Sequence, residues 1–408
     1  MTEPVNKRGN KSADIIVIGA GMVGAAAALG LAQQGLNIIL VEARLPQNDF
    51  NPDVIDNRVS ALTRASEKLL NSMGVWDSMQ AMRAKPYTDM HVWDAEGKGL
   101  IHFDAAELAE PSLGHIVENQ VTQLALWHAI TEMQNIEIIC PDKVMDVDRT
   151  NGLSLVSLES GKQITAELVV VADGKQSATR DLLGIKTRGW LYDQHAVVAT
   201  VVVDESHNDT AWQRFMPEGP LAFLPLAVGN KDTCSIVWST SPEKAESLVA
   251  MSDTDFCQSL GEASEFKLGN IISVEKRGVF PLELKHAQSY IREGYVLIGD
   301  AAHAVHPLAG QGVNLGFLDV QALQEIICNA QEQGRNLGGM RVLRQYERDR
   351  KASNMTMLAA MDGFKRLFSN RILPLVAVRN AGLSFVNNLG ALKHFFVRYA
   401  MGLDQLRP

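Results

Sequence analysis

The chain has 408 residues, of which 46% are hydrophobic and 21% are charged, and its formal net charge is -9 at pH 7. A chain of this length exceeds one core of ordinary size, so we expect a globular protein with two or more packing units. The negative charge argues against a nucleic-acid partner, because proteins that bind the phosphate backbone concentrate positive charge.

An apolar run near the N-terminus resembles a secretion signal or a membrane span. Lys7, Arg8 and Lys11 precede this run, which extends over residues 13–32. Asp14 and three glycines interrupt it at spacings that have an explanation of their own, so we expect a folded segment in a cytoplasmic protein. The cysteines contain no Cys-x-x-Cys pair, and we therefore expect neither a disulfide framework nor a metal site.

The first predicted elements form a βαβ unit. Asp14 is followed by four β-branched apolar residues up to Ile18, and this pattern is typical of a buried parallel strand over residues 14–18. An alanine-rich helix is expected over residues 22–34, with Gly35 in the position that ends many helices. A second buried strand is expected over residues 37–41, directly before Glu42.

The turn between the first strand and the helix has the spacing Gly-x-Gly-x-x-Gly. Gly19 would make the tight turn, Gly21 would let a pyrophosphate approach the backbone, and Gly24 would let the helix pack on the strand. Glu42 follows Gly24 by 18 residues, close to the spacing of an acid that binds a ribose hydroxyl. The sequence therefore predicts a dinucleotide site, and a glycine-rich turn that serves only helix packing is the alternative.

Two later strands also end in a glycine and an acid. One leads into Asp173-Gly174 and the other into Gly299-Asp300. Parallel α/β sheets bind their ligands at the carboxyl ends of the strands. We therefore expect both pairs at the same sheet edge as the first glycine motif.

The middle of the chain follows a different pattern. From about residue 190 to residue 280, apolar and polar residues alternate in short segments, which predicts a mostly antiparallel sheet inserted into the α/β domain. After Gly316 the pattern is helical. The predicted division is a dinucleotide-binding domain of residues 1–185 and 282–335, an inserted sheet domain of residues 186–281, and a C-terminal helical region of residues 336–408.

In this order, the three motifs resemble those of the single-component FAD-dependent aromatic hydroxylases. The resemblance implies an α/β fold with a Rossmann-like FAD-binding domain, an inserted, mostly antiparallel β-sheet substrate domain and a C-terminal helical region. It also implies FAD as cofactor and NAD(P)H as a cosubstrate that binds transiently, since no second Gly-x-Gly-x-x-Gly follows a strand. Asp173 would then lie near the nicotinamide route, and Asp300 would meet the ribityl and pyrophosphate groups.

The resemblance also implies a set of site residues. Arg58 and His303 are the catalytic candidates. The simpler interpretations are that Arg58 forms a surface salt bridge, and that His303 and His306 belong to the structure of the FAD loop, with no carboxylate partner. The residues expected to contact the cofactor are Gly19, Gly21, Gly24, Glu42, Arg58, Asn119, Gln123, Asp173, Gly174, Gly299, Asp300, Gly310, Gly312, Val313 and Asn314.

Further motifs resemble the ubiquinone-biosynthesis hydroxylases of this family, and most of all their demethoxyubiquinol hydroxylase branch. The matching segments are residues 57–62, 104–108, 114–119 with Gln123, 212–215, 219–226 and 309–312. The resemblance implies a prenylated benzoquinol or phenol substrate, with a ubiquinone-synthesis protein complex as a further partner. Hydroxylation at another ring position, a flavin-dependent prenyl reductase or halogenase, and a non-catalytic FAD-holding scaffold are the alternatives.

The C-terminal tail is basic although the whole chain is acidic. Residues 363–408 contain seven Lys or Arg and one acid, Asp404, and their apolar residues repeat at helical spacing. Such a segment could lie on an anionic membrane surface, where each basic residue contributes about 1 kcal/mol. We therefore expect either peripheral contact with the inner membrane or packing of the tail on the FAD domain or on a partner subunit.

Overall fold

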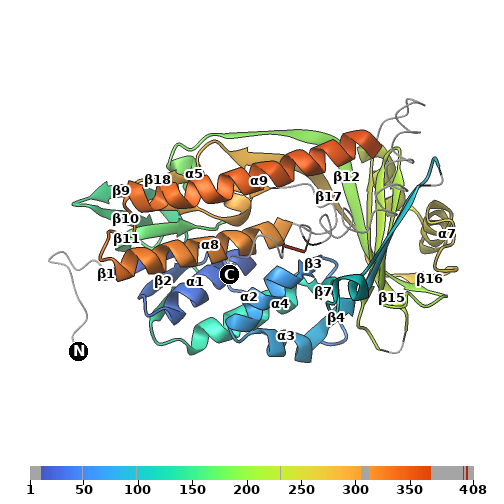
Figure 1. Cartoon of the computed structure of the whole chain (residues 1–408), viewed down its shortest axis with the longest axis horizontal. Coiled ribbons are helices and arrows are strands. Elements are labelled where there is room, and N and C mark those ends of the chain that lie inside the picture. The colour runs from blue at the N-terminus through green and yellow to red at the C-terminus, as the bar shows by residue number, and fades with distance from the viewer. Residues whose placement is uncertain are drawn as a thin grey trace.

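Two large sheets and one small sheet organise the part of the chain that the structure describes (Figure 1). The structure is a computed structural model of the whole chain. Its described residues are 11–47, 49–97, 99–229, 231–304, 312–368, 398 and 401–402. The first large sheet lies with most of the helices at one end of the molecule, and the second large sheet stands at the other end.

The first sheet is the predicted α/β core. Its strands follow the order β18-β19-β11-β1-β2-β8, and the hairpin of β9 and β10 joins it by an antiparallel pairing of β10 with β11. β19, β11, β1, β2 and β8 are parallel to their neighbours in that order, and their Ile and Val side chains form the main core. The strands are β1 (Lys11–Ile18), β2 (Ile38–Val41), β8 (Ile136–Ile139), β9 (Val144–Thr150), β10 (Leu153–Leu158), β11 (Gln163–Val171), β18 (Ile291–Arg292) and β19 (Tyr295–Leu297).

Four helices pack against one another beside this sheet. α1 contacts both α4 and α8, and α8 contacts α9, which runs alongside it in Figure 1. The alanines of α1 are fully buried, because only small side chains let the helix approach the sheet and its neighbours this closely. Gly35, with a φ of +87°, follows the C-cap of α1, as predicted. These helices are α1 (Met22–Gln33), α4 (Asn119–Glu132), α8 (Gly312–Glu332) and α9 (Met340–Phe368), and the short α5 (Ala178–Leu182) follows β11.

The second sheet is mostly antiparallel, as predicted, and has the order β20-β17-β12-β15-β14-β13-β5-β6, with β16 paired to β12. Two helices cover its outer face around a separate core that includes Phe223, Ile236 and Phe256. The strands are β5 (Asp89–Asp94), β6 (Leu100–Asp104), β12 (Thr187–Val203), β13 (Thr210–Met216), β14 (Gly219–Leu226), β15 (Thr233–Thr240), β16 (Ile271–Val274), β17 (Gly278–Ala287) and β20 (His303–Ala304), and the helices are α6 (Pro242–Ala250) and α7 (Asp253–Ala263).

The second sheet extends beyond the predicted range of residues 186–281. β5 and β6 come from the segment that the sequence assigns to the first part of the FAD-binding domain, and β5 pairs in parallel with β13, with His91 opposite Trp212. A local pattern does not reveal this pairing, because the two strands are more than 100 residues apart in the chain. The sheet domain is therefore built from at least two separate segments.

A small sheet of order β3-β7-β4 lies between the two large ones. Its Ala61 and Ile116 pack against Ala222 and Leu224 of the second sheet. The elements of this region are β3 (Val59–Thr63), α2 (Arg64–Ser72), α3 (Trp76–Arg83), β4 (Ala84–Tyr87), the 3₁₀ helix η1 (Ala105–Leu108) and β7 (Gly114–Glu118), and a second 3₁₀ helix, η2 (Gly299–Ala301), follows β19. The small sheet thus joins the two domains by apolar contacts.

The predicted helical region begins with α9, but most of the basic tail lies outside the described residues. Met401, near the end of the chain, is buried against Ala105 and Leu113, and its carbonyl oxygen accepts a hydrogen bond from the N–H of Ala65 at 3.3 Å. No helix within the described ranges has the length and apolar character that a membrane crossing needs. Within the same ranges, no three His, Cys, Asp or Glu side chains are grouped to hold a metal ion.

Candidate active site

The glycine motif closes a tight turn between β1 and α1. Gly19 has a φ of +99°, and a Cβ atom there would lie 2.5 Å from the carbonyl oxygen of Ala172. A Cβ atom at Gly24 would lie 2.0 Å from the carbonyl oxygen of Gly19, whereas a Cβ atom at Gly21 would meet no atom within 4 Å. Packing within the protein therefore requires that positions 19 and 24 have no side chain. Gly21 instead faces open space that a phosphate can enter.

The start of α1 is available to an anion. Gly21 is the N-cap residue of this helix, and no side chain caps it. Gly21, Met22 and Val23 all line the cavity described below. Because the first N–H groups of a helix lack partners within the helix and carry the positive end of its dipole, this position can hold a pyrophosphate.

Glu42 and Gln123 hold the same turn from two sides. The Glu42 carboxylate accepts hydrogen bonds from the N–H groups of Ala20, at 2.6 Å, and of Arg44, at 3.0 Å. The Gln123 side chain donates to the carbonyl oxygen of Ala20 at 3.3 Å. Both predicted cofactor residues thus contact the glycine turn, and neither belongs to the cavity lining formed by the described residues.

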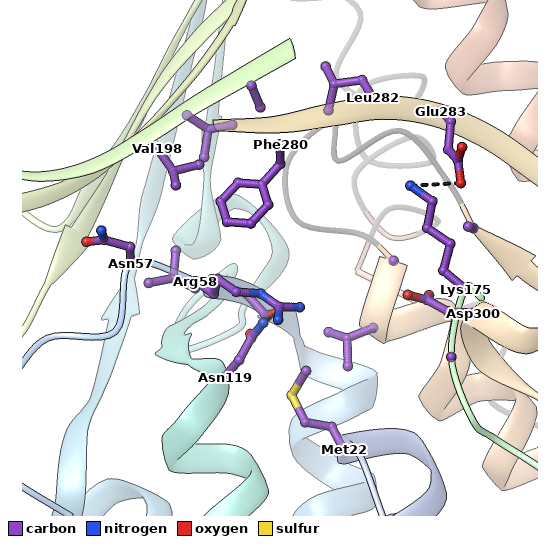
Figure 2. Close-up of a pocket in the computed structure, with 18 of the residues that line it drawn as sticks. Met22, Asn57, Arg58, Asn119, Lys175, Val198, Phe280, Leu282, Glu283 and Asp300 are labelled. Atoms are coloured by element: carbon purple, nitrogen blue, oxygen red, sulfur yellow. Dashed lines mark hydrogen bonds and ion pairs between the residues drawn. The ribbon is translucent and has the colours of Figure 1, made fainter. Parts of the chain in front are cut away.

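A cavity of about 570 Å³ lies where the strand ends of the first sheet face the second sheet. Figure 2 shows Arg58 and Asn119 on the side opposite Phe280, with Lys175 and Asp300 together at one end. Phe280 belongs to the second sheet, whereas Asp300 and Lys175 follow strands of the first. One cavity therefore joins the predicted cofactor edge to the predicted substrate sheet.

Asp300 lies in a region of mixed charge. The Asp300 side chain is open to the cavity, but the surrounding protein excludes bulk water and raises the pKa of Asp300 above the ordinary carboxyl value, although the electrostatic interactions with His303, Lys175 and Arg58 act in the opposite direction. Lys175 Nζ lies 2.8 Å from a carboxylate oxygen of Glu283 on β17, and burial lowers the pKa of this lysine. Neither Lys175 nor Glu283 was predicted as a site residue, although Lys175 directly follows the Asp173-Gly174 motif.

Asp173 and Gly174 lie at the end of β11, as predicted. One carboxylate oxygen of Asp173 accepts the N–H of Thr179 at 3.1 Å, and the other is buried with no hydrogen-bond partner in the described part of the chain. Gly174 has a φ of +83° and lines the cavity. The unsatisfied oxygen is a position where a ligand or a water molecule could donate a hydrogen bond.

Arg58 and Asn119 are placed by main-chain hydrogen bonds. The carbonyl oxygen of Arg58 accepts the N–H of Asn119 at 2.8 Å, and the N–H of Arg58 donates to Asp56 at 3.0 Å. The Asn119 side chain accepts the Ser60 hydroxyl at 2.6 Å. The Arg58 side chain is exposed to the cavity and forms no salt bridge with any described residue, so the surface salt bridge considered from the sequence finds no partner there.

His303 lies in the protein interior and is not part of the cavity lining that the structure describes. Its Nε2 atom is 2.5 Å from a carboxylate oxygen of Asp319 on α8, and both side chains are fully buried. The expectation that His303 lacks a carboxylate partner is therefore wrong. The pairing crosses the junction between β20 and α8, where the spacing of residues gives no local signal.

Asp319 is the centre of a buried network that the sequence analysis did not identify. The same oxygen that contacts His303 accepts the N–H of Gly299 at 3.0 Å. The other oxygen accepts Arg350 Nε at 2.8 Å and Asn354 Nδ2 at 3.2 Å. Burial alone would raise the pKa of Asp319, but the charges and hydrogen bonds of His303 and Arg350 outweigh it and lower the pKa to about 2. The available sequence signal was a carboxylate that directly follows the apolar residues Phe317 and Leu318 in α8.

Asn314 also lies in the interior. Its side-chain oxygen accepts the N–H of Thr63 at 3.0 Å and the Ser66 hydroxyl at 2.7 Å, and its amide nitrogen donates to the carbonyl oxygen of Ala61 at 2.8 Å. These bonds tie the start of α8 to β3 and α2. The Asn314 side chain is engaged with these three residues and is not part of the described cavity lining, and the contact of Asn314 with the cofactor stays a prediction.

The remaining residues of the predicted flavin loop divide into two groups. Gly312 and Val313, at the start of α8, line the cavity. Gly310 and His306 lie outside the described residues. The cavity, the open space at Gly21 and the uncapped start of α1 together fit a dinucleotide cofactor such as FAD.

Comparison with known sequences supports this geometry. Residues 12–360 match the family described as FAD binding domain. The chain is 40% identical to 3-demethoxyubiquinol 3-hydroxylase of Escherichia coli (strain K12), with 97% of this chain and 100% of that protein covered. It is 38% identical to the mitochondrial ubiquinone biosynthesis monooxygenase COQ6 of Xenopus tropicalis, with 95% and 93% covered, and 34% identical to the ubiquinone hydroxylase UbiL of Rhodospirillum rubrum, with 100% and 94% covered.

Solved structures show the same fold at lower identity. The p-nitrophenol 4-monooxygenase PnpA from Pseudomonas putida DLL-E4 superimposes with a TM-score of 0.76 and 20% identity, covering 95% of this chain and 97% of that chain. A substituted form of HpxO from Klebsiella pneumoniae, complexed with FAD, gives a TM-score of 0.71 at 17% identity, with 93% and 97% covered. Together these comparisons confirm the predicted fold class and FAD as the cofactor.

Replacing Gly21 separates cofactor binding from folding. Gly21→Val should fold, because Gly21 has φ -64° and ψ 174° and a Cβ atom there meets nothing, but it should abolish FAD binding by filling the space of the pyrophosphate. Gly24→Val is the matched control, since its side chain would collide with Gly19 and destabilise the fold by at least about 1–3 kcal/mol. Bound FAD is measured by absorbance and folding by circular dichroism. A Gly21→Val protein with full FAD content would contradict the assignment.

Asp300→Asn should have opposite effects on stability and on cofactor binding. Because the pKa of Asp300 is raised in the folded protein, its ionisation opposes folding above that pKa. The FAD-free variant should therefore unfold at higher denaturant concentration than the FAD-free wild type at pH 8, and this advantage should vanish below about pH 4. FAD affinity should fall roughly tenfold to a hundredfold through loss of a charged hydrogen-bond acceptor. An unchanged FAD dissociation constant would refute the role of Asp300 in binding FAD. A stability difference independent of pH would refute the raised pKa of Asp300.

Proposed function

The chain belongs to the FAD-binding domain family, and on that premise we propose that it hydroxylates the ring of a prenylated benzoquinol or phenol, with NAD(P)H as reductant and O₂ as oxidant. The observation that carries this proposal is the continuous cavity that joins the dinucleotide edge of one sheet to an apolar wall of the other. The relatives that are named as ubiquinone-pathway hydroxylases support the choice of substrate. The protein is accordingly an FAD-dependent aromatic monooxygenase.

The reaction needs two electrons and one oxygen atom for the ring. When bound, FAD takes the electrons from NAD(P)H and activates O₂. One oxygen atom replaces a ring hydrogen as a hydroxyl group, and the other leaves as water. A quinol or phenol ring is itself electron-rich, so the chain has to bind the cofactor, hold the ring beside it and keep water away.

We assign these tasks to separate parts of the cavity. Gly21 and the start of α1 would bind the pyrophosphate, and Asp300 the ribityl group, while Gly312 and Val313 would lie against the flavin ring. The apolar residues of the second sheet would exclude water from the reacting ring. These assignments rest on the openness of the α1 end and on the position of the carboxylate at the cavity edge.

The two catalytic candidates receive different roles. Arg58 reaches the cavity with a positive charge that acts on Asp300, which supports an electrostatic role near the cofactor. His303 is fully buried and hydrogen-bonded to Asp319, which supports a positioning role behind the Gly299-Asp300 turn. We therefore propose that His303 takes no direct part in proton transfer to the substrate.

A prenylated quinol should accelerate NAD(P)H oxidation by the purified holoenzyme, because the filled cavity couples electron transfer to oxygen transfer. The measurements are NAD(P)H consumption, O₂ uptake and mass spectrometry of the product with ¹⁸O₂, and product should carry one labelled oxygen atom. The Gly21→Val protein, expected to lack FAD, is the control. If hydrogen peroxide accounts for all the O₂ consumed in the presence of a series of prenylated quinols and phenols, hydroxylation is not the function.

We propose that the protein is cytoplasmic. A second proposal concerns its basic tail. The substrate carries a long hydrocarbon chain and should reside in a membrane, and residues 363–408 hold seven of the basic side chains of an otherwise acidic protein. We propose that these charges bring the enzyme to an anionic membrane surface. The buried contact of Met401 with Ala105 and Leu113 supports packing for the end of the tail, so the proposal is limited to the charges before it.

Vesicle flotation at low salt tests the tail. The wild type should float with vesicles that contain anionic lipid and stay behind with neutral vesicles. A full-length variant with five tail charges removed should lose binding to the anionic vesicles while it keeps FAD. The substitutions are Lys365→Gln, Arg366→Gln, Arg371→Gln, Arg379→Gln and Lys393→Gln. Equal flotation of both proteins, or none by the wild type, would refute membrane contact through these charges and leave packing of the tail on the FAD domain or on a partner protein.

A further inference from the structure

The wall that the second sheet presents to the cavity is almost entirely apolar. Six of its residues come from four neighbouring strands and have hydrocarbon side chains. They are Ala196, Val198, Ala222, Leu224, Val237 and Phe280. Such a wall can hold an aromatic ring and a hydrocarbon chain, but it provides no hydrogen bonds to choose between rings.

Gln213 interrupts this wall with a primary amide. It lies on β13, directly opposite Ala222 of β14, and it lines the cavity although only 6% of the residue is exposed. Its neighbours point to the other face of the sheet: Trp212 packs in the core below α7, and Arg214 donates to the carbonyl oxygen of Ala263 at 2.6 Å. Since side chains alternate along a strand, the amide of Gln213 faces the cavity.

This amide has no hydrogen-bond partner among the described residues, unlike the other amides of the cavity. Asn57 donates to the carbonyl oxygen of Lys276, and Asn119 accepts the Ser60 hydroxyl. Buried amides are almost always hydrogen-bonded in folded proteins, so an amide that faces a cavity without a protein partner indicates a partner that enters the cavity.

The chemistry of the partner follows from the position of Gln213. The residues that fit FAD lie at the strand ends of the first sheet, whereas Gln213 stands on the opposite wall, among residues suited to the substrate ring. A hydrocarbon chain offers no hydrogen bond. A hydroxyl, carbonyl or methoxy oxygen on the ring does, and an amide can serve it as donor, as acceptor or as both.

We propose that the side-chain amide of Gln213 binds one oxygen substituent of the substrate ring and thereby determines which ring the enzyme accepts. This inference rests on the proposed function and adds a specificity residue to it. Ser239, the other neutral polar side chain of this wall, lies two strands away at about 10 Å, so it would face a different part of the substrate.

Gln213→Met tests the proposal, because methionine has a similar length and lacks the amide. The probes are a prenylated benzoquinol with hydroxyl and methoxy groups and a series of analogues, each lacking one of these oxygen atoms. Dissociation constants are measured on the FAD-loaded protein by the change in flavin fluorescence, and kcat/KM by product formation. The variant should bind the complete ring roughly tenfold to a hundredfold more weakly, and one analogue, which lacks the contacted oxygen, should bind wild type and variant equally within about threefold.

Ser235→Ala is the matched control. The Ser235 hydroxyl is also buried without a partner and lies on the same sheet opposite Leu224, but Ser235 does not line the cavity in the described structure. Its loss should leave discrimination between the rings unchanged. FAD content and FAD affinity should equal those of the wild type in both variants, and Gln213→Leu replaces Gln213→Met if the methionine protein loses its cofactor.

The outcomes separate this inference from the proposed function. If the wild type releases no hydroxylated product from any of these rings, while Gln213→Met still weakens binding of the rings that keep one particular oxygen and not of the analogue that lacks it, the function is refuted and the binding role stands. The role of Gln213 is overturned if the wild type hydroxylates the ring but the variant binds all analogues more weakly by the same factor, or binds none of them more weakly. It is also overturned if both Gln213→Met and Gln213→Leu bind FAD more weakly than the wild type.

Discussion

A buried carboxylate holds the cofactor edge of this protein together. An isolated charge in the interior would be strongly unfavourable, and Asp319 is stable there because four hydrogen bonds and the positive charge of Arg350 compensate for the water it lacks. Through these bonds one side chain joins α8, α9, β20 and the turn at Gly299. Asp300 is the next residue in the chain, so the position of the cavity carboxylate depends on a network that lies outside the described cavity lining.

The parts of the site that depend on backbone sterics could be predicted from sequence. Gly19 and Gly24 stand where a Cβ atom would collide with the main chain, and such limits act between residues close in the chain or at the ends of adjacent strands. For the same reason the βαβ unit, the end of α1 at Gly35 and the positions of Asp173 and Asp300 after their strands all agree with the structure.

The parts that depend on distant contacts could not be predicted. Three contacts join separate elements of the chain, and no local sequence pattern predicts them. They are the pairing of β5 with β13, the ion pair of Lys175 with Glu283 and the bond of His303 to Asp319. The side-chain partners of Asn314 belong to the same group, because Thr63 and Ser66 lie about 250 residues before it in the chain. The cavity wall around Gln213 likewise emerges only when five strands are aligned in register.

The order of strands in the first sheet has a consequence for biosynthesis. β11 lies between β1 and β19, and β19 follows β11 by more than 120 residues, within which most of the second sheet is encoded. At about 5–20 residues per second, a ribosome would need roughly 6–25 s to reach β19 after β11, and during this time the end of β11 that pairs with β19 has no neighbour on that side. High contact order of this kind slows folding and exposes unpaired strands to aggregation. The architecture that brings three strand ends to one cavity thus leaves one edge of β11 unpaired in the growing chain until β19 has been synthesised.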